Sequence, residues 1–226
     1  MHRRTYLTTV TTGMVGATAG CLGGLFDSGP ENVVLGEPSD QVAESSALAY
    51  PAYGELFPRF SLPTAFDEST FESAAVDVPA LYTAFYAFCP AECILLMNSM
   101  GNVQGELDSR GLLDAVQLVG ITFDPERDTP AELESHAADS GIDHTHDSWQ
   151  YLRPKDDDQA KTVVDEQLGI GFEQVRAEGE EAYDYNHVTV TFLVNPDGVV
   201  ERAYRGEPLE VERVVDDFET VVAAYE

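Results

Sequence analysis

The pattern of apolar and polar positions predicts a chain in which strands alternate with helices. Residues 80–88 form an apolar run without alternation, which is typical of a strand buried on both faces. The run 116–123 has the same character, and 58–66 also reads as a strand. Residues 188–194 and 199–204 flank an Asn-Pro-Asp-Gly turn, which predicts a hairpin.

Four other segments carry helical signals. Residues 92–109 have apolar positions at helical spacing. The run Thr129-Pro-Ala-Glu132 opens a second helix with a capping-box arrangement and a proline in the first turn. A third helix over 156–169 ends in glycine, and a fourth over 208–225 closes the chain. The order of elements predicts one α/β domain of about 170 residues, with a mixed central sheet and helices on both faces.

The first 55 residues lack this pattern. Residues 1–21 contain Arg3-Arg4, a weakly apolar run and Thr-Ala-Gly-Cys21, which resembles a twin-arginine export signal with a lipobox. The apolar run has about 13 residues, whereas a permanent membrane-spanning helix needs about 20. We expect Cys21 to be the lipid-attachment site, with the protein on the outer face of the cytoplasmic membrane; the alternative is a plain signal that removes Cys21. Residues 22–55, rich in Gly, Ser, Pro and Glu, predict a flexible linker before a domain over 56–226.

The charge balance excludes one class of function. Asp and Glu total 41 against 12 Lys and Arg, which gives a net charge of −29. Nucleic-acid binding needs a basic groove, and no basic stretch follows the first few residues. The acidic composition is typical of proteins from salt-loving organisms, because salt screens the repulsion among surface carboxylates.

Two of the three cysteines form a close pair. Cys89 and Cys93 lie four residues apart, where the buried strand passes into the helix over 92–109. On the first turn of a helix, this spacing brings two side chains to about 5–6 Å of one another, which allows a disulfide or a shared metal ion. A helix amino terminus also favours the thiolate. An inert disulfide is the plainer alternative, but closing so short a loop stabilises a fold only weakly.

Histidine supplies candidate partners for the pair. His187 precedes the apolar run 188–194, from where it can reach the same end of the sheet. His144 and His146, two residues apart in an acidic loop, resemble a metal clip but are expected to be simply solvated. We expect His136, in the helix after Pro130, to be exposed or to have its hydrogen bonds satisfied.

Three motifs in order resemble the Sco/SenC family. They are Cys89-Pro-Ala-Glu-Cys93, then Ile121-Thr-Phe-Asp-Pro-Glu-Arg-Asp-Thr-Pro130, then Asn186-His187 followed by Phe192-Leu-Val-Asn-Pro-Asp-Gly198. The resemblance spans roughly residues 56–226 and implies a thioredoxin-like fold. It also implies copper, Cu(I) or Cu(II), as the bound metal, with Cys89, Cys93 and His187 as its ligands.

Two positions depart from the family pattern. Ile94 stands where a proline usually follows the second cysteine, and Asn186 stands where an aspartate commonly precedes the histidine. The missing carboxylate affects how the imidazole is oriented, and Asp184 is a candidate substitute. Asp124, Arg127 and Asp128 are candidates for the rim of the site, although Asp128 is also explained by its place before the next helix.

These residues support two functions from different classes. The first is a copper metallochaperone, a binding protein rather than an enzyme, that serves the dinuclear copper centre of cytochrome c oxidase and has a copper-accepting subunit as its partner. The alternative is an extracytoplasmic thiol-disulfide oxidoreductase in which Cys89 and Cys93 are the catalytic pair. Peroxide reduction is disfavoured, because no Thr hydroxyl accompanies the first cysteine in Tyr86-Ala-Phe-Cys89.

Overall fold

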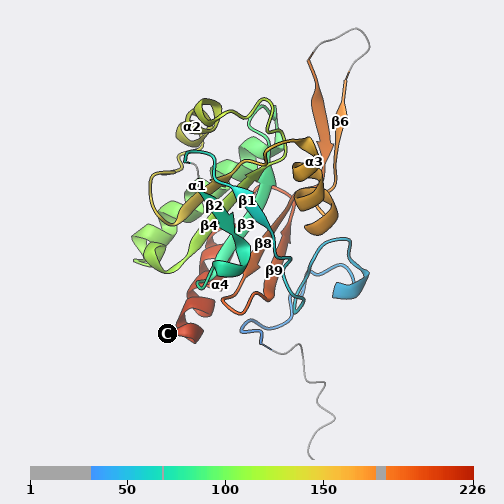
Figure 1. Cartoon of the computed structure of the whole chain (residues 1–226). Coiled ribbons are helices and arrows are strands. Elements are labelled where there is room, and N and C mark those ends of the chain that lie inside the picture. Colours follow the sequence, from blue (N-terminus) through green and yellow to red (C-terminus); the bar gives the residue numbers. More distant parts are fainter. Residues whose placement is uncertain (1–31, 68, 177–181) are drawn as a thin grey trace, which may run out of the picture.

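A computed structural model describes residues 32–67, 69–176 and 182–226 of the chain (Figure 1). The predicted export signal, with Cys21 at its end, lies outside the described residues. Among the residues described, no helix combines the length and the apolar character that crossing a membrane requires.

A mixed sheet of five strands is the centre of the domain. Its order is β5 (Trp149–Leu152), β4 (Gln117–Thr122), β3 (Ala80–Phe85), β8 (Val190–Val194) and β9 (Val200–Arg205). β3, β4 and β5 are parallel, whereas β8 is antiparallel to both β3 and β9. Every residue of β3 is buried, because neighbouring strands flank it and side chains cover both of its faces. The predicted mixed α/β architecture is confirmed.

Helices and loops cover the two faces of this sheet. α1 (Glu92–Ser109) packs against α4 (Val211–Tyr225) on one face, and Figure 1 shows them behind the sheet. On the other face, Tyr82 of β3 stacks on Phe57 with ring centroids 4.6 Å apart. The hairpin of β1 (Ser61–Pro63) and β2 (Thr70–Glu72) covers this second face in front. The carboxyl end of β3 and the amino end of α1 lie at the same end of the sheet, and Cys89 and Cys93 lie there.

The local signals placed the helices well. The helix predicted over 92–109 coincides with α1. α2 (Pro130–Asp139) begins as predicted, and the Thr129 hydroxyl accepts a hydrogen bond from the Glu132 amide. The helix predicted over 156–169 is α3 (Asp157–Ala160) followed by a π-helical segment (Lys161–Gln167).

Gly169 ends that segment as predicted and is required there. Its φ is +66°, and a Cβ at this position would lie 2.0 Å from the carbonyl oxygen of Ala49. An L-residue would therefore be strained by its backbone and blocked by the neighbouring chain.

Three predicted boundaries are wrong. Residues 58–66 do not form a long strand, because only Ser61–Pro63 pairs, and it pairs with β2 outside the main sheet. The strand expected over 188–194 begins at Val190. The predicted linker over 22–55 is too long, because residues from 32 onward pack on the domain, with Leu35 and Ala52 buried.

A separate two-stranded hairpin was not predicted. β6 (Phe172–Val175) pairs with β7 (Asp184–His187), and Phe172 lies opposite His187. Figure 1 shows these strands, in orange, extending away from the main sheet. His187 thus ends a strand of this hairpin instead of simply preceding β8.

Candidate metal centre

Cys89 lies in the turn between β3 and α1, and Cys93 lies in the first turn of α1. The backbone amide of Cys93 donates a hydrogen bond of 3.3 Å to Cys89 Sγ. Ala91, the residue before α1, has no side-chain cap. The sulfur of Cys89 therefore takes the place of a capping side chain at the helix amino terminus, where exposed amides favour negative charge.

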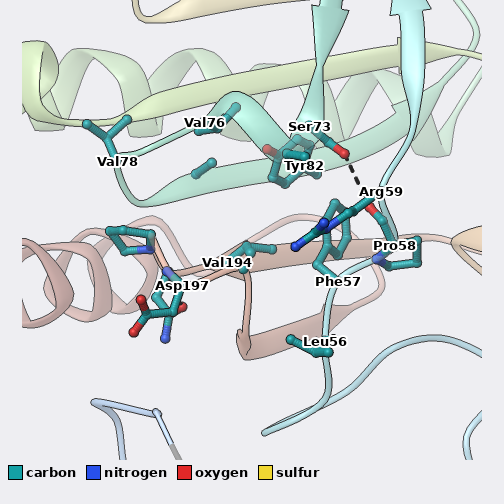
Figure 2. Close-up of a pocket in the computed structure, with 15 residues that line it drawn as sticks. Leu56, Phe57, Pro58, Arg59, Ser73, Val76, Val78, Tyr82, Val194 and Asp197 are labelled. Atoms are coloured by element: carbon teal, nitrogen blue, oxygen red, sulfur yellow. Dashed lines mark hydrogen bonds between the residues drawn. The ribbon is translucent and has the colours of Figure 1, made fainter.

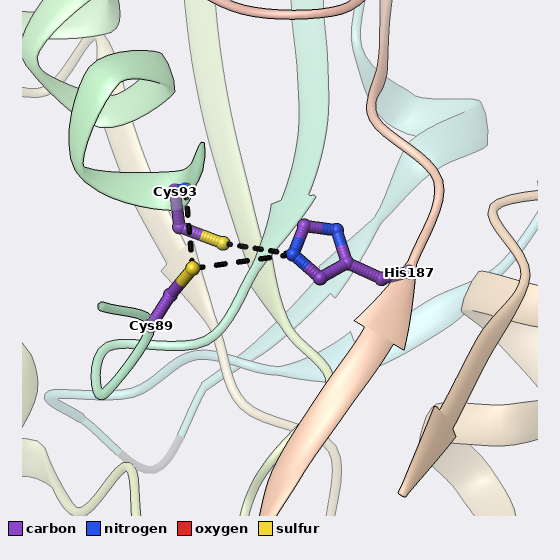
Figure 3. Close-up of side chains that lie close together, drawn as sticks. All are labelled: Cys89, Cys93 and His187. Carbon is purple, nitrogen blue, oxygen red and sulfur yellow. Dashed lines mark hydrogen bonds between the residues drawn. The ribbon is translucent and has the colours of Figure 1, made fainter. Parts of the chain in front are cut away.

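His187 brings the third donor from the end of β7. Its Nε2 lies 3.7 Å from Cys93 Sγ and 4.0 Å from Cys89 Sγ (Figure 3). The three donor atoms lie within 4.8 Å of one another, and this is the metal-capable group found among residues 32–67, 69–176 and 182–226. Neither cysteine is in a disulfide. The structure thus brings together the three ligands that the resemblance implied.

Burial and hydrogen bonding give the two thiols opposite character. Cys89 is 4% exposed and Cys93 is 1% exposed. The hydrogen bond from Cys93 holds the pKa of Cys89 well below its usual range, against the effect of burial. The same contact, together with burial, raises the pKa of Cys93. In the metal-free protein, Cys89 is therefore the thiolate and Cys93 the thiol.

His187 sits in an aromatic surround and lacks one hydrogen-bond partner. Its ring centroid is 5.5 Å from that of Phe123 and 5.8 Å from that of Tyr86. Burial lowers the pKa of His187, but the hydrogen bond and charge of Cys89 outweigh it, so the net shift is upward. Nδ1 of this ring is buried without a hydrogen-bond partner in the described chain. Packing against the rings of Phe123 and Tyr86 therefore helps to orient the imidazole.

The expected substitute for the missing carboxylate is wrong. Asp184 accepts hydrogen bonds from the Tyr86 hydroxyl and from the Tyr185 amide, and it does not contact His187. Asn186 is exposed, and as the neighbour of His187 in a strand it points to the opposite face. Asp184 therefore ties the hairpin to Tyr86 and leaves Nδ1 of His187 unpaired.

The three rim candidates form a buried cluster beside the centre. Asp124 accepts from Arg127 Nε and, at 2.9 Å, from the Tyr183 hydroxyl. Asp128 accepts from the Thr122 hydroxyl and, at 3.0 Å, from the Ala87 amide. Both carboxylates are fully buried. They hold the loop after β4 to the turn before Cys89 and to the hairpin that carries His187.

The other histidines stand apart from the centre. His136 Nδ1 is 3.2 Å from the Tyr151 hydroxyl, and burial lowers the pKa of this histidine to about 4. His146 Nδ1 is 2.8 Å from the Ser148 hydroxyl, and the His144 ring lies 4.6 Å from that of Phe66. None of these histidines belongs to the group of converging donors.

A cavity of about 350 Å³ lies at the other end of the sheet. It is lined by Ala80 at the start of β3, by Val194 at the end of β8 and by the segment around Phe57 (Figure 2). Because β3 runs from this cavity towards Cys89, the cavity and the metal centre occupy opposite ends of the strand.

Sequence reasoning missed Tyr183 and the hairpin around it. Tyr183 contacts both Asp124 and Arg127, and its carbonyl oxygen accepts from Arg127 Nη1 at 2.8 Å. In Tyr183-Asp-Tyr-Asn-His187 the histidine indicates a candidate ligand, and the two tyrosines at alternate positions indicate a strand.

Comparisons with known proteins agree with this arrangement. No curated protein matches the chain. Among solved structures, Arabidopsis thaliana ScoI with copper bound is 18% identical, with a TM-score of 0.60 over 76% of this chain and 99% of that one. A SCO1/SenC family lipoprotein from Bacillus anthracis is 17% identical, with a TM-score of 0.60 over 73% and 94%. BsSco, described with a disulfide switch and as a member of the Sco family of cytochrome c oxidase assembly proteins, is 18% identical, with a TM-score of 0.58 over 77% and 96%.

These structures are similar to the chain in fold. The family assignment comes from the sequence, because the SCO1/SenC family model matches residues 51–223. That range includes the cysteine pair, the rim cluster and His187. The chain therefore belongs to the SCO1/SenC family.

Proposed function

We propose that this protein is a copper metallochaperone that carries the ion on Cys89, Cys93 and His187 and delivers it to the dinuclear copper centre of cytochrome c oxidase. The observation that carries the proposal is the convergence of two sulfurs and one imidazole nitrogen within 4.8 Å. Cys93 and His187 are 94 residues apart in the sequence. The fold therefore builds the donor set from separate elements.

The donor chemistry selects the metal. Thiolate and imidazole are soft or borderline ligands, which suit copper, whereas Ca²⁺ and Mg²⁺ prefer oxygen ligands. The converging group contains no carboxylate. Three donors leave the ion open to a further ligand, as stepwise exchange to an acceptor protein requires. Copper is in this sense the cargo of the protein.

The relatives support the same role. The Arabidopsis thaliana protein of similar fold was solved with copper bound, and BsSco is described as a cytochrome c oxidase assembly protein. The acceptor we propose is accordingly the copper-accepting subunit of that oxidase.

The cysteine pair also supplies a redox gate for the cargo. In exchange with an external disulfide, the Cys89–Cys93 disulfide forms while the external disulfide takes the two electrons and is reduced to thiols, and the centre loses two of its three donors. The centre can therefore hold copper only while both cysteines are reduced.

A copper titration with thiol counting tests the proposal. We expect the reduced wild-type domain to bind one copper per chain and to show a sulfur-to-Cu(II) charge-transfer band. Cys89→Ser or Cys93→Ser should abolish the band, and His187→Ala should weaken binding strongly while both thiols remain countable. Stoichiometric binding that survives both serine substitutions would contradict the proposal and direct attention to His144 and His146.

The close thiols favour a second candidate function, thiol-disulfide exchange with a client protein. The Cys89 thiolate is an attacking sulfur, and Cys93 lies beside it as a resolving thiol. His187→Ala separates the two functions, because disulfide exchange needs only the cysteines. Retained exchange together with unchanged copper affinity in this variant would favour the reductase.

The proposed location is the outer face of the cytoplasmic membrane, with a lipid anchor on Cys21. The support is the twin-arginine and lipobox pattern in residues 1–21. Mass spectrometry of the mature protein should show acylation of Cys21, and Cys21→Ser should release the protein from membranes. A soluble wild-type protein without lipid would contradict the anchor.

A further inference from the structure

Exposed apolar side chains gather around the metal centre. The described chain exposes eight large hydrophobic residues, and four of them lie within two positions of a proposed ligand. Phe88 precedes Cys89, Ile94 and Leu95 follow Cys93, and Val188 follows His187, and each is between 48% and 50% exposed. We call these four residues the apolar collar. Because the three donor atoms converge, the backbone positions next to them lie in the same region of the protein.

The collar is unusual for this protein. The net charge of −29 makes most of the surface acidic, and the other exposed hydrophobics, Val42, Leu56, Phe66 and Tyr225, are scattered along the chain. Single exposed apolar residues are ordinary, whereas a group of them marks an interaction site.

An open groove runs past Val188 of the collar and past His187. It has a volume of about 610 Å³ and is also bordered by Glu92, by Arg205 at the end of β9 and by Glu207 in the loop that follows. His187 forms part of its wall. The groove therefore gives a segment of another protein access to His187.

We propose that the apolar collar and this groove are the docking surface for the copper acceptor, which places a ligand-bearing loop in the groove and an apolar surface over the collar. The inference rests on the proposed function and adds to it the surface by which the partner is recognised.

Burial of the donors points to this occupant. Ligand exchange requires an acceptor atom to bond to the ion while the present donors still hold it. Since Cys89 and Cys93 are 4% and 1% exposed, the acceptor must press against the residues next to them. Among the residues next to the donors, Phe88, Ile94 and Val188 are the exposed apolar ones that such an acceptor meets. A partner of complementary chemistry presents apolar side chains around its own exposed copper ligand.

The charges at the groove fit a partner that is not strongly basic. Arg205, Glu92 and Glu207 all line the groove, so charges of both signs border it. Charge alone would give little selectivity here, and contacts between exposed charges weaken further in salt. Apolar contact over the collar is then the main source of affinity.

A polar collar tests the inference without changing a ligand. The triple variant Ile94→Gln, Leu95→Gln and Val188→Thr keeps side-chain size, adds no charge and uses residues compatible with the helix and the strand end. The matched control is Leu56→Gln, which makes the same change at a residue 75% exposed beside the cavity at the opposite end of the sheet. The probe is the apo form of the soluble copper-accepting domain of the oxidase from the same organism.

Loading, binding and transfer are measured on each protein. We expect unchanged copper stoichiometry and charge-transfer band in all three, which shows that the variants fold and load. For the triple variant we expect at least a tenfold loss in affinity for the acceptor and in transfer rate, with Leu56→Gln equal to wild type. A tenfold loss corresponds to about 1.4 kcal/mol.

The outcomes separate this inference from the proposed function. If the triple variant transfers copper at the wild-type rate, the docking surface is overturned and the proposed metallochaperone function is not affected. Collar-dependent binding without any transfer would support the surface but contradict copper delivery. Failure of loaded wild type both to bind and to transfer would overturn both. The inference would also be overturned if the triple variant alone lost binding to phosphatidylglycerol vesicles, because the collar would then contact a membrane. Loss of dimerisation in light scattering by the triple variant alone would likewise assign the collar to a second copy of the chain.

Discussion

The guanidinium of Arg127 lies over the ring of Tyr183, 3.8 Å from its centroid, and joins the loop after β4 to the hairpin that carries His187. Nη1 of this arginine donates to the Tyr183 carbonyl oxygen at 2.8 Å, while its Nε donates to Asp124. Tyr183 in turn donates to Asp124 at 2.9 Å. Arg127, Tyr183 and Asp124 thus each contact the other two. These contacts fix the hairpin at a point four residues before the proposed imidazole ligand.

Arg127→Met should loosen that hairpin without touching a ligand. A cation over an aromatic ring contributes about 0.5–2 kcal/mol, and a charged hydrogen bond adds to it. We expect about a tenfold loss in copper affinity, faster amide hydrogen exchange in β7 and two thiols that still react normally. Arg176→Met is the control, because Arg176 lies 5.6 Å from the same ring and does not contact Asp124. Unchanged exchange in β7 would show that the hairpin does not depend on Arg127.

The opposite character of the two thiols predicts the order of their modification. In the reduced, metal-free protein, Cys89 carries the lowered pKa and accepts the Cys93 amide, whereas the pKa of Cys93 is raised. Because the thiolate is the nucleophile, limiting iodoacetamide at pH 6 should label Cys89 first. Peptide mass spectrometry measures the order, and Cys89→Ser should leave Cys93 largely unlabelled under the same conditions. Preferential labelling of Cys93 would contradict the assignment.

Local chemistry explains which parts of the fold were predictable. The limits of α1 follow from Pro90, from acidic Glu92 in the first turn and from apolar spacing over two faces, all of which are visible in the sequence. The central strand β3 was also readable, because a strand buried on both faces is an unbroken apolar run. The π-helical segment Lys161–Gln167 could not be predicted, because its hydrogen-bond pattern, shifted relative to an α-helix, is not visible in the residue types.

Long-range packing explains what was missed. β7 has no buried residue, and its stability comes from Tyr185 against Phe123, 5.3 Å between ring centroids and 62 positions away in sequence. The place of His187 before the run 188–194 indicates that it can reach the same end of the sheet, but its role as a ligand beside the cysteines is implied only by the family resemblance. The prediction that Asp184 replaces the missing carboxylate is wrong, because alternation along a strand, and not nearness in sequence, decides which side chain faces the imidazole.

Asp128 should make the stability of the fold depend on pH. Burial raises the pKa of this carboxyl from 3.8 to about 7. The folded state therefore holds a proton that the unfolded state has already released, so this residue's contribution to stability is present at pH 4 and falls as pH rises towards about 7. Asparagine cannot ionise, so Asp128→Asn should lose that dependence. The stability of this variant relative to wild type should therefore be higher at pH 8 than at pH 5.

Urea unfolding at both pH values and constant salt measures the difference. Asp108→Asn, an exposed change in α1, is the control for the loss of one negative charge, and it should shift stability equally at the two pH values. If Asp128→Asn and Asp108→Asn behave alike, Asp128 is ionised in the folded state.

Glu201 should hold the segment around Leu35 against the domain. This fully buried carboxylate accepts hydrogen bonds from the amides of Val34, at 2.9 and 3.1 Å, and Leu35, at 2.9 Å, and from Asn195 Nδ2 at 2.7 Å. Glu201→Ala leaves these donors without their acceptor, at a cost of about 1–3 kcal/mol. We expect faster cleavage by a Glu-specific protease at Glu37 and Glu44, because the segment is released from β9.

Copper binding should not change in the same variant, since Glu201 lies at the end of β9 away from His187. Glu134→Ala, an exposed change in α2, is the control and should leave the cleavage pattern unaltered. Equal protection of Glu37 and Glu44 in both variants would mean that other contacts hold the segment, such as those of Arg202 with the Gly36 carbonyl oxygen and of Arg213 with Asp40. Released cleavage with unchanged copper binding would show instead that the packing of this segment on the domain and the metal centre are independent.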